Sequence, residues 1–196
     1  MSCVKYNNVI DVSYEPVDPS VMPVSLDDMK RHLYLLFDTE GGFSVDDDDT
    51  YIETELIPAA VVAVEKYTGR LLRPSTVTAI IRNEKGGQHL PYGPITQFSS
   101  LSDEDGNAIE SEDYKIKGLD FKYIQSPCYA YMTAVYEAGY TTDNLPSGLR
   151  MAILHQGAFL CKSRGDQQQE YASSDVGMSA SAKALANPYR RVTWLL

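Results

Sequence analysis

The sequence lacks the features that mark secreted and membrane proteins. Its three cysteines (Cys3, Cys128 and Cys161) are widely spaced and odd in number, so we expect no disulfide framework. No apolar run approaches the roughly 20 residues that span a bilayer. The first eight residues lack the charged and apolar regions of a signal peptide. We therefore predict a protein made in a cytoplasm, with no membrane partner.

Motifs for catalysis and for nucleotide or metal binding are also missing. The chain has no Gly-x-Ser-x-Gly elbow, and no Cys-x-x-Cys or His-Glu-x-x-His spacing. The glycine pairs at 41–42 and 86–87 lack the Gly-Lys-Ser/Thr ending of a phosphate loop. His32, His89 and His155 have no recognisable partner motif. We predict no catalytic residue, no metal and no cofactor.

One dense carboxylate cluster stands at Asp46-Asp47-Asp48-Asp49. A calcium or magnesium site needs oxygen ligands that converge on one point, and these aspartates lack the spacing that achieves this. They fit better as a solvated run facing the positive end of a helix dipole. A cation site, and with it a metal-dependent hydrolase, is the less favoured alternative. The run at 103–105 is more simply a charged hairpin tip.

The charge balance restricts the partners. With 27 acidic and 17 basic side chains the formal net charge is -10, which repels phosphate backbones. We therefore predict no sequence-specific binding of DNA. The acidity serves solubility, or gives a surface past which DNA moves without adhering. The 14 tyrosines suit half-buried surfaces and subunit contacts, although strands favour them too.

The periodicity predicts an α+β fold. After an extended arm over residues 1–24, Ser25 and Asp28 form a capping-box-like start of a helix. A second helix covers about 50–68, bent at Pro58 and capped by Gly69. A third runs from Pro146 to about Lys162, where Gly157 and Ala158 allow close approach of another helix. A short alanine-rich helix covers about 180–186.

Between the second and third long helices, the sequence pattern is typical of short strands separated by turns. Strands are predicted near 76–82, 95–101, 108–109, 114–117, 121–125 and 131–136, and the short connections imply antiparallel pairing. The sequence thus predicts a small bundle of about four helices (25–163) with an antiparallel β-insertion at about 71–140. Residues 164–196 are predicted as a mobile loop, the short helix and a C-terminal docking tail.

The C-terminal tail is the one segment that suggests a binding role. Val192, Trp194, Leu195 and Leu196 are apolar, although chain ends are usually polar and frayed. Trp and Arg are also common at binding hot spots. The tail docks either on the chain's own helices or on a neighbouring subunit or partner, and the sequence leaves both open.

Three stretches and their order resemble the head–tail connector (adaptor) proteins of tailed bacteriophages, in the variety with a β-rich insertion in a helical bundle. They are the opening helix at 24–33, the "D-x-x-I-x-x-x-L-I-x-A-A-x-x-A-V-E-x-Y-T-G-R-x-L" pattern from Asp49, and "Y-x-A-G-Y…L-P-x-x-L-R-x-A-I-L" from Tyr136. The final "N-P-Y-R-R" is similar as well. The arm before Val24 and the acidic segment 41–49 depart from the family pattern, so their roles stay open.

The resemblance implies a non-enzymatic virion protein. It implies a closed ring of about twelve copies beneath the portal, joined on its other side to the next neck or tail protein. It also makes Tyr189, Arg190, Arg191 and Trp194 candidates for contact with the portal. DNA would pass through the channel, and assembly would take place in the cytoplasm of a bacterial host. A neck or tail-completion protein next to the adaptor is the alternative.

Overall fold

The computed structural model describes residues 9–37, 49–83, 88–126, 130–162 and 177–191. It divides into two compact units, one of residues 1–19 and 73–140 and the other of residues 20–72 and 141–196. The first is built of strands and the second of helices, which confirms the α+β class. Across the described ranges, no helix combines the length and apolar character needed to cross a membrane.

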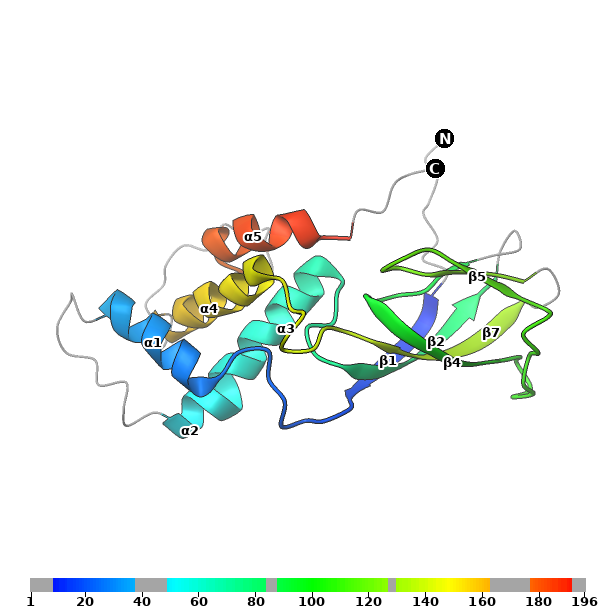
Figure 1. Cartoon of the computed structure of the whole chain (residues 1–196), viewed down its shortest axis with the longest axis horizontal. Helices are drawn as coiled ribbons and strands as arrows, with labels where there is room; N and C mark the ends of the chain where they lie inside the picture. The colour runs from blue at the N-terminus through cyan, green and yellow to red at the C-terminus, as the bar shows by residue number, and fades with distance from the viewer. Residues whose placement is uncertain (1–8, 38–48, 84–87, 127–129, 163–176, 192–196) are drawn as a thin grey trace. The chain divides into compact units, whose positions relative to one another are not determined.

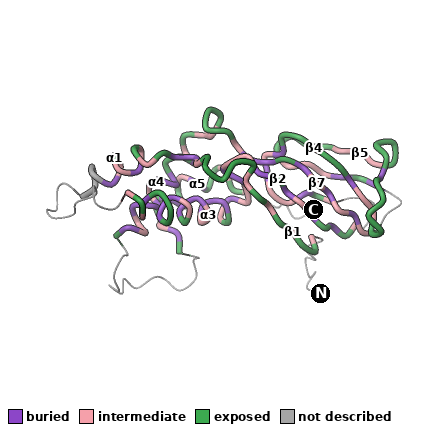
Figure 2. The backbone as a smooth tube through the Cα atoms, turned by 90° about the horizontal axis from the view of Figure 1, so that it is seen from below, coloured by how far each residue is buried: buried purple, intermediate pink, exposed green. Residues whose placement is uncertain are grey.

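The helical unit is built around α4 (Ser147–Lys162), which packs against α1 (Leu26–Phe37), α3 (Ile57–Thr68) and α5 (Ala180–Ala186) (Figure 1). The buried residues of α3 and α4 appear in purple in Figure 2. Gly157 of α4 makes room for α1, because a Cβ there would stand 2.5 Å from Cε of the fully buried Met29. The predicted close approach at Gly157 is therefore present.

Local chemistry fixes the start of α1 and the end of α3 as predicted. The Asp28 N–H donates to Ser25 Oγ at 3.1 Å, and the Ser25 N–H donates to the Asp28 carboxylate at 3.5 Å, which is the reciprocal pattern of a capping box. Gly69 ends α3 in the left-handed conformation with φ of 68°, and its N–H donates to Glu65 O. The sequence patterns that predicted these two caps are confirmed.

The second predicted helix is interrupted before Pro58. A short α2 (Asp49–Tyr51) leads into a π-helical turn (Ile52–Leu56), and Pro58 lies in the first turn of α3. Proline lacks an N–H and its ring crowds the carbonyl four residues earlier in an α-helix. A π-turn just upstream inserts one residue and relieves that clash. The sequence predicted that the helix is irregular near Pro58, but it did not predict a π-helical turn.

The strand unit contains a four-stranded antiparallel sheet in the order β1-β2-β7-β4. Its strands are β1 (Val9–Pro16), β2 (Ser75–Arg82), β7 (Tyr131–Ala138) and β4 (Ile95–Ser102). A three-stranded sheet has the order β3-β6-β5, with β3 (Gln88–His89), β6 (Tyr123–Gln125) and β5 (Lys115–Lys117). The predicted antiparallel pairing is confirmed for 114–117 with 121–125.

The N-terminal segment differs from the predicted arm, because residues 9–16 pair with β2 as an edge strand. Three prolines hid this strand, although its exposed and half-buried residues alternate regularly from Asp11 to Pro16. Pro16 ends it at a position where an edge strand can do without an N–H. A bulge lies between Val9 and Asp11, and the Val12 N–H donates to the Asp11 carboxylate at 2.8 Å.

The turn at 103–107 forms the predicted hairpin, but in a short form. An antiparallel bridge joins Ser102 to Ala108 and the Ile109 N–H donates to Leu101 O, while β4 pairs along its length with β7. Asp103 accounts for the tight turn, since its carboxylate accepts the N–H groups of Asp105 (3.0 Å) and Asn107 (2.8 Å). The acidic tip is thus a well-ordered turn.

Two glycines in left-handed conformations give a matched test of this unit. A Cβ on Gly139 (φ +119°) would meet Arg73 O at 2.1 Å, whereas a Cβ on Gly106 (φ +84°) would meet nothing within 4 Å. Gly106→Ala should cost about 1 kcal/mol of unfolding free energy from backbone strain alone, and Gly139→Ala at least about 2 kcal/mol more. Urea denaturation measures both. Equal costs would show that the clash is relieved by backbone movement.

Candidate functional site

The sequence left a cation site open as an alternative. In the described parts of the chain, its candidate ligands do not converge. No group of three or more His, Cys, Asp or Glu side chains there is placed to hold a metal ion. Of the aspartate run, Asp49 forms an ion pair with Lys30 at 2.8 Å, while 46–48 lie outside the described residues. The geometry therefore adds no support to the hydrolase alternative.

Two histidines that the sequence treated separately form a pair. The rings of His32 on α1 and His155 on α4 pack edge to face with centroids 5.0 Å apart. Burial, and then the neighbouring His155, lower the pKa of His32 below its ordinary value of 6.5. The helical spacing put each histidine on a helix, but pairing them requires knowing which faces of α1 and α4 meet.

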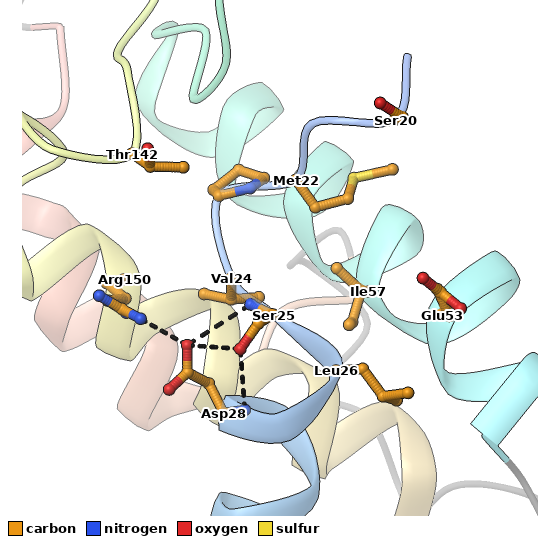
Figure 3. A pocket seen from close by; sticks show the side chains of 11 residues that line it. Ser20, Met22, Val24, Ser25, Leu26, Asp28, Glu53, Ile57, Thr142 and Arg150 are labelled. Atoms are coloured by element: carbon orange, nitrogen blue, oxygen red, sulfur yellow. Dashed lines mark hydrogen bonds and ion pairs between the residues drawn. The ribbon is translucent and has the colours of Figure 1, made fainter. Parts of the chain in front are cut away.

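A cavity of about 470 Å³ opens beside the start of α1 (Figure 3). Its apolar wall includes Met22, Val24 and Ile57, and an ion pair between Asp28 and Arg150 closes one side. The hydrogen bond from Arg150, followed by that from Ser25, lowers the pKa of Asp28. Asp28 therefore serves at once as the helix cap and as the partner of an arginine on α4.

The C-terminal segment is held to the helices by a buried amide. Gln156 on α4 is fully buried; its Nε2 donates to Gly177 O at 2.8 Å and its Oε1 accepts the Ser179 N–H at 2.9 Å. Ser179 in turn caps α5 by accepting the N–H of Ala182 at 3.1 Å. A single side chain thus fixes where α5 begins.

The segment after α5 is fixed to the end of α3, and we call residues 66–72 together with 187–191 the C-terminal junction. Arg70 Nε donates to Tyr189 O at 2.7 Å, and the Arg191 N–H donates to Thr68 O at 2.8 Å. The Tyr189 ring covers Gly148, where a Cβ would lie 2.7 Å from the ring. The portal-contact candidates Tyr189 and Arg191 are therefore bound to the chain's own helices through their backbone or ring.

Arg190 presents its side chain differently. It is exposed, and its guanidinium lies 5.2 Å from the centre of the Tyr67 ring, whose hydroxyl reaches Asn187 at 3.4 Å. The fourth candidate, Trp194, lies outside the described residues. Sequence reasoning missed Tyr67, Arg70 and Gln156. Of these three, only Gln156 gave a signal in the sequence, because a polar residue on the apolar face of a helix indicates a buried hydrogen-bond partner.

Comparisons with known proteins bear on the fold. No protein-family model matches the sequence, and no curated protein matches it. A chain from the neck of an empty GTA particle computed with C6 symmetry superposes with a TM-score of 0.66 at 19% identity, covering 93% of this chain and 97% of that chain. The fold is shared with a particle neck protein.

Two further structures agree. A chain from the virion of a native gene transfer agent (GTA) particle gives a TM-score of 0.64 at 17% identity, and one from the neck of a native GTA particle computed with C12 symmetry gives 0.61 at 16%. Each match covers 93% of this chain and 97% of the other. Because both units lie within the matched length, the likeness extends over the strands as well as the helices.

The buried amide of Gln156 should control the attachment of the C-terminal segment. Gln156→Leu keeps the size of the side chain but leaves Gly177 O and the Ser179 N–H without this partner, at a cost of about 1–3 kcal/mol. Hydrogen exchange of residues 177–191 should accelerate while the strands stay protected. Gln97→Leu, at an exposed position of β4, is the control. Unchanged exchange in 177–191 would show that α5 docks without the amide.

The histidine pair should make the helical unit sensitive to acid. Because burial holds the pKa of His32 below 6.5, the unfolded chain binds more protons as the pH falls through that value, and stability is lost. The midpoint of thermal unfolding should drop between pH about 7.5 and about 5.5, and His32→Phe should flatten that slope. His89→Phe, on the strand unit, should leave it unchanged. Equal slopes in all three proteins would contradict the assignment.

Proposed function

We propose that this protein is a head–tail adaptor (connector) ring subunit of a phage-like particle, a structural protein of the neck. The observation that carries the proposal is the match of both units, over 93% of the chain, to neck proteins of gene transfer agent particles. The resemblance of the helix and turn patterns to phage adaptors points the same way. In this role the chain has no catalytic step and needs no cofactor.

The adaptor works as a closed ring of about twelve copies, and the C12 and C6 symmetries of the matched necks support a ring. The ring binds the portal on one side and the next neck or tail protein on the other. DNA passes through it without sequence-specific contacts, because the net charge of -10 opposes adhesion of phosphates. The protein assembles in the cytoplasm of the host and ends in the virion.

The portal contact is assigned to the C-terminal tail. Tyr189 and Arg191 are bound to α3 and α4, so they set the point from which the tail starts. Arg190 is exposed there, and Trp194 follows three residues beyond the fixed position 191. A rigid starting point lowers the entropy lost when the apolar tail binds. The supporting feature is therefore the C-terminal junction.

A neck or tail-completion protein next to the adaptor is the second candidate, because the matched chains come from particle necks and such a protein fits that match equally well. The two roles differ in partner. Purified full-length protein is incubated with the portal and, separately, with the tail proteins of the same particle. Binding to the portal supports the adaptor, and binding to the tail alone supports the second candidate.

Trp194 should act as a hot spot of portal binding. Trp194→Ala should weaken binding to the portal at least about tenfold, since buried tryptophans often contribute 2 kcal/mol or more, by rough estimate, to an interface. Interferometry with immobilised portal measures this. Leu119→Ala, which removes an apolar side chain 90% exposed on the turn before β6, is the control and should bind normally. Equal affinity of Trp194→Ala and the unmodified protein would move the contact elsewhere.

A further inference from the structure

The distribution of charge distinguishes the C-terminal junction from the rest of the chain. Residues 66–72 and 187–191 contain four basic residues and no acidic one: Lys66, Arg70, Arg190 and Arg191. The remainder of the chain holds 13 basic against 27 acidic side chains. A basic surface on an otherwise acidic protein is suited to an acidic partner.

The basic side of this surface is held in place before any partner arrives. The Arg70 guanidinium is bound to Tyr189 O, and the Arg190 guanidinium lies over the Tyr67 ring. Lys66, next to Tyr67 on α3, is exposed. Cations stacked on or bonded to the protein lose less freedom on binding than mobile lysines do. Arginine and tyrosine are also enriched at protein interfaces.

The chain itself carries the complementary surface. Residues 103–113 contain six acidic side chains and no basic one. Glu104 and Asp105 are exposed at the tip of a turn that Asp103 holds rigid through the N–H groups of Asp105 and Asn107. Ile109, 6% exposed, anchors the far side of the turn, and its N–H donates to Leu101 O. We call residues 103–113 the acidic turn.

We propose that the C-terminal junction of one copy binds the acidic turn of a second copy, and that this contact joins neighbours head to tail. The inference rests on the proposed ring function. A heterologous contact needs two different, complementary surfaces on every subunit, and its repetition closes a ring. The strand unit supplies one surface and the helical unit the other. Arg190 then serves the neighbouring subunit, while the tail after Arg191 serves the portal.

A protein partner accounts for these features better than nucleic acid does. The 27 acidic side chains oppose a phosphate backbone along most of the chain, whereas the acidic turn of a second copy offers the basic junction a compact, folded negative surface. Lys115 and Lys117 of β5 follow the acidic residues at the far end of the turn, whereas Glu104 and Asp105 are exposed at its tip with no basic residue beside them in the sequence. These two residues are the ones to change.

The test is an exchange of charge between the two surfaces. Variant one is Lys66→Glu with Arg190→Glu, and variant two is Glu104→Lys with Asp105→Lys. Each purified alone should self-associate at least about tenfold more weakly than the unmodified protein. Mixed together they should recover association, because each supplies the surface that the other lacks. Mass photometry and sedimentation velocity measure the species, and added salt should weaken them in the unmodified protein.

The control has the same change of net charge away from the junction. Arg31→Glu with Lys162→Glu alters two exposed positions on α1 and α4 and should self-associate normally. A loss equal to that of variant one would reduce the effect to net charge and overturn the proposal. So would failure of the mixture to recover, or an unmodified protein that stays monomeric at its highest soluble concentration.

The outcomes separate this inference from the proposed function. If the charge variants assemble like the unmodified protein while the portal still recruits the chain, the inference fails and the adaptor role stands. If the charges control self-association but purified particles lack the protein in their necks, the adaptor role fails and the contact stands. Loss of portal binding by variant one, with self-association intact, would assign the basic surface to the portal and overturn the inference.

Discussion

The helical unit depends on how the carbonyl groups at the end of α3 are satisfied. A helix leaves its last carbonyls without partners inside the helix. Here Gly69 supplies one N–H to Glu65 O, and Arg191, from more than a hundred residues further along the chain, supplies another to Thr68 O. The buried Glu65 carboxylate adds a bond to the Leu72 N–H at 2.8 Å. The end of α3 therefore holds both the residues that follow it, up to Leu72, and the C-terminal segment at Arg191.

This arrangement gives the proposed binding surface its rigidity. Because the bonds at Thr68 and Tyr189 involve backbone atoms, the identity of the side chains at 190 and beyond is not constrained by the attachment. Those side chains are therefore available for recognition, while the backbone carries the structure. The same division holds in the acidic turn, where Asp103 organises the backbone and its neighbours face solvent.

Local signals in the sequence predicted the local structure well. Ser25, Asp28 and Gly69 act through atoms a few residues away, so their roles follow from spacing alone. Relations between distant segments were out of reach, as with the pairing of β1 with β2 or the meeting of Gln156 with Ser179. These depend on which faces pack together. The binding role of residues 189–191 stays a prediction, and their attachment beside the end of α3 could not be read from the sequence.

The outer strand β1 has a consequence for how the sheet meets foreign strands. A subunit that accumulates in many copies risks pairing through open sheet edges into indefinite aggregates. Along β1 a bulge breaks the regular spacing, the Asp11 side chain occupies the Val12 N–H, and Pro16 offers no N–H at all. These three irregularities discourage a foreign strand from adding there, so the edge of this sheet is protected against indefinite strand pairing.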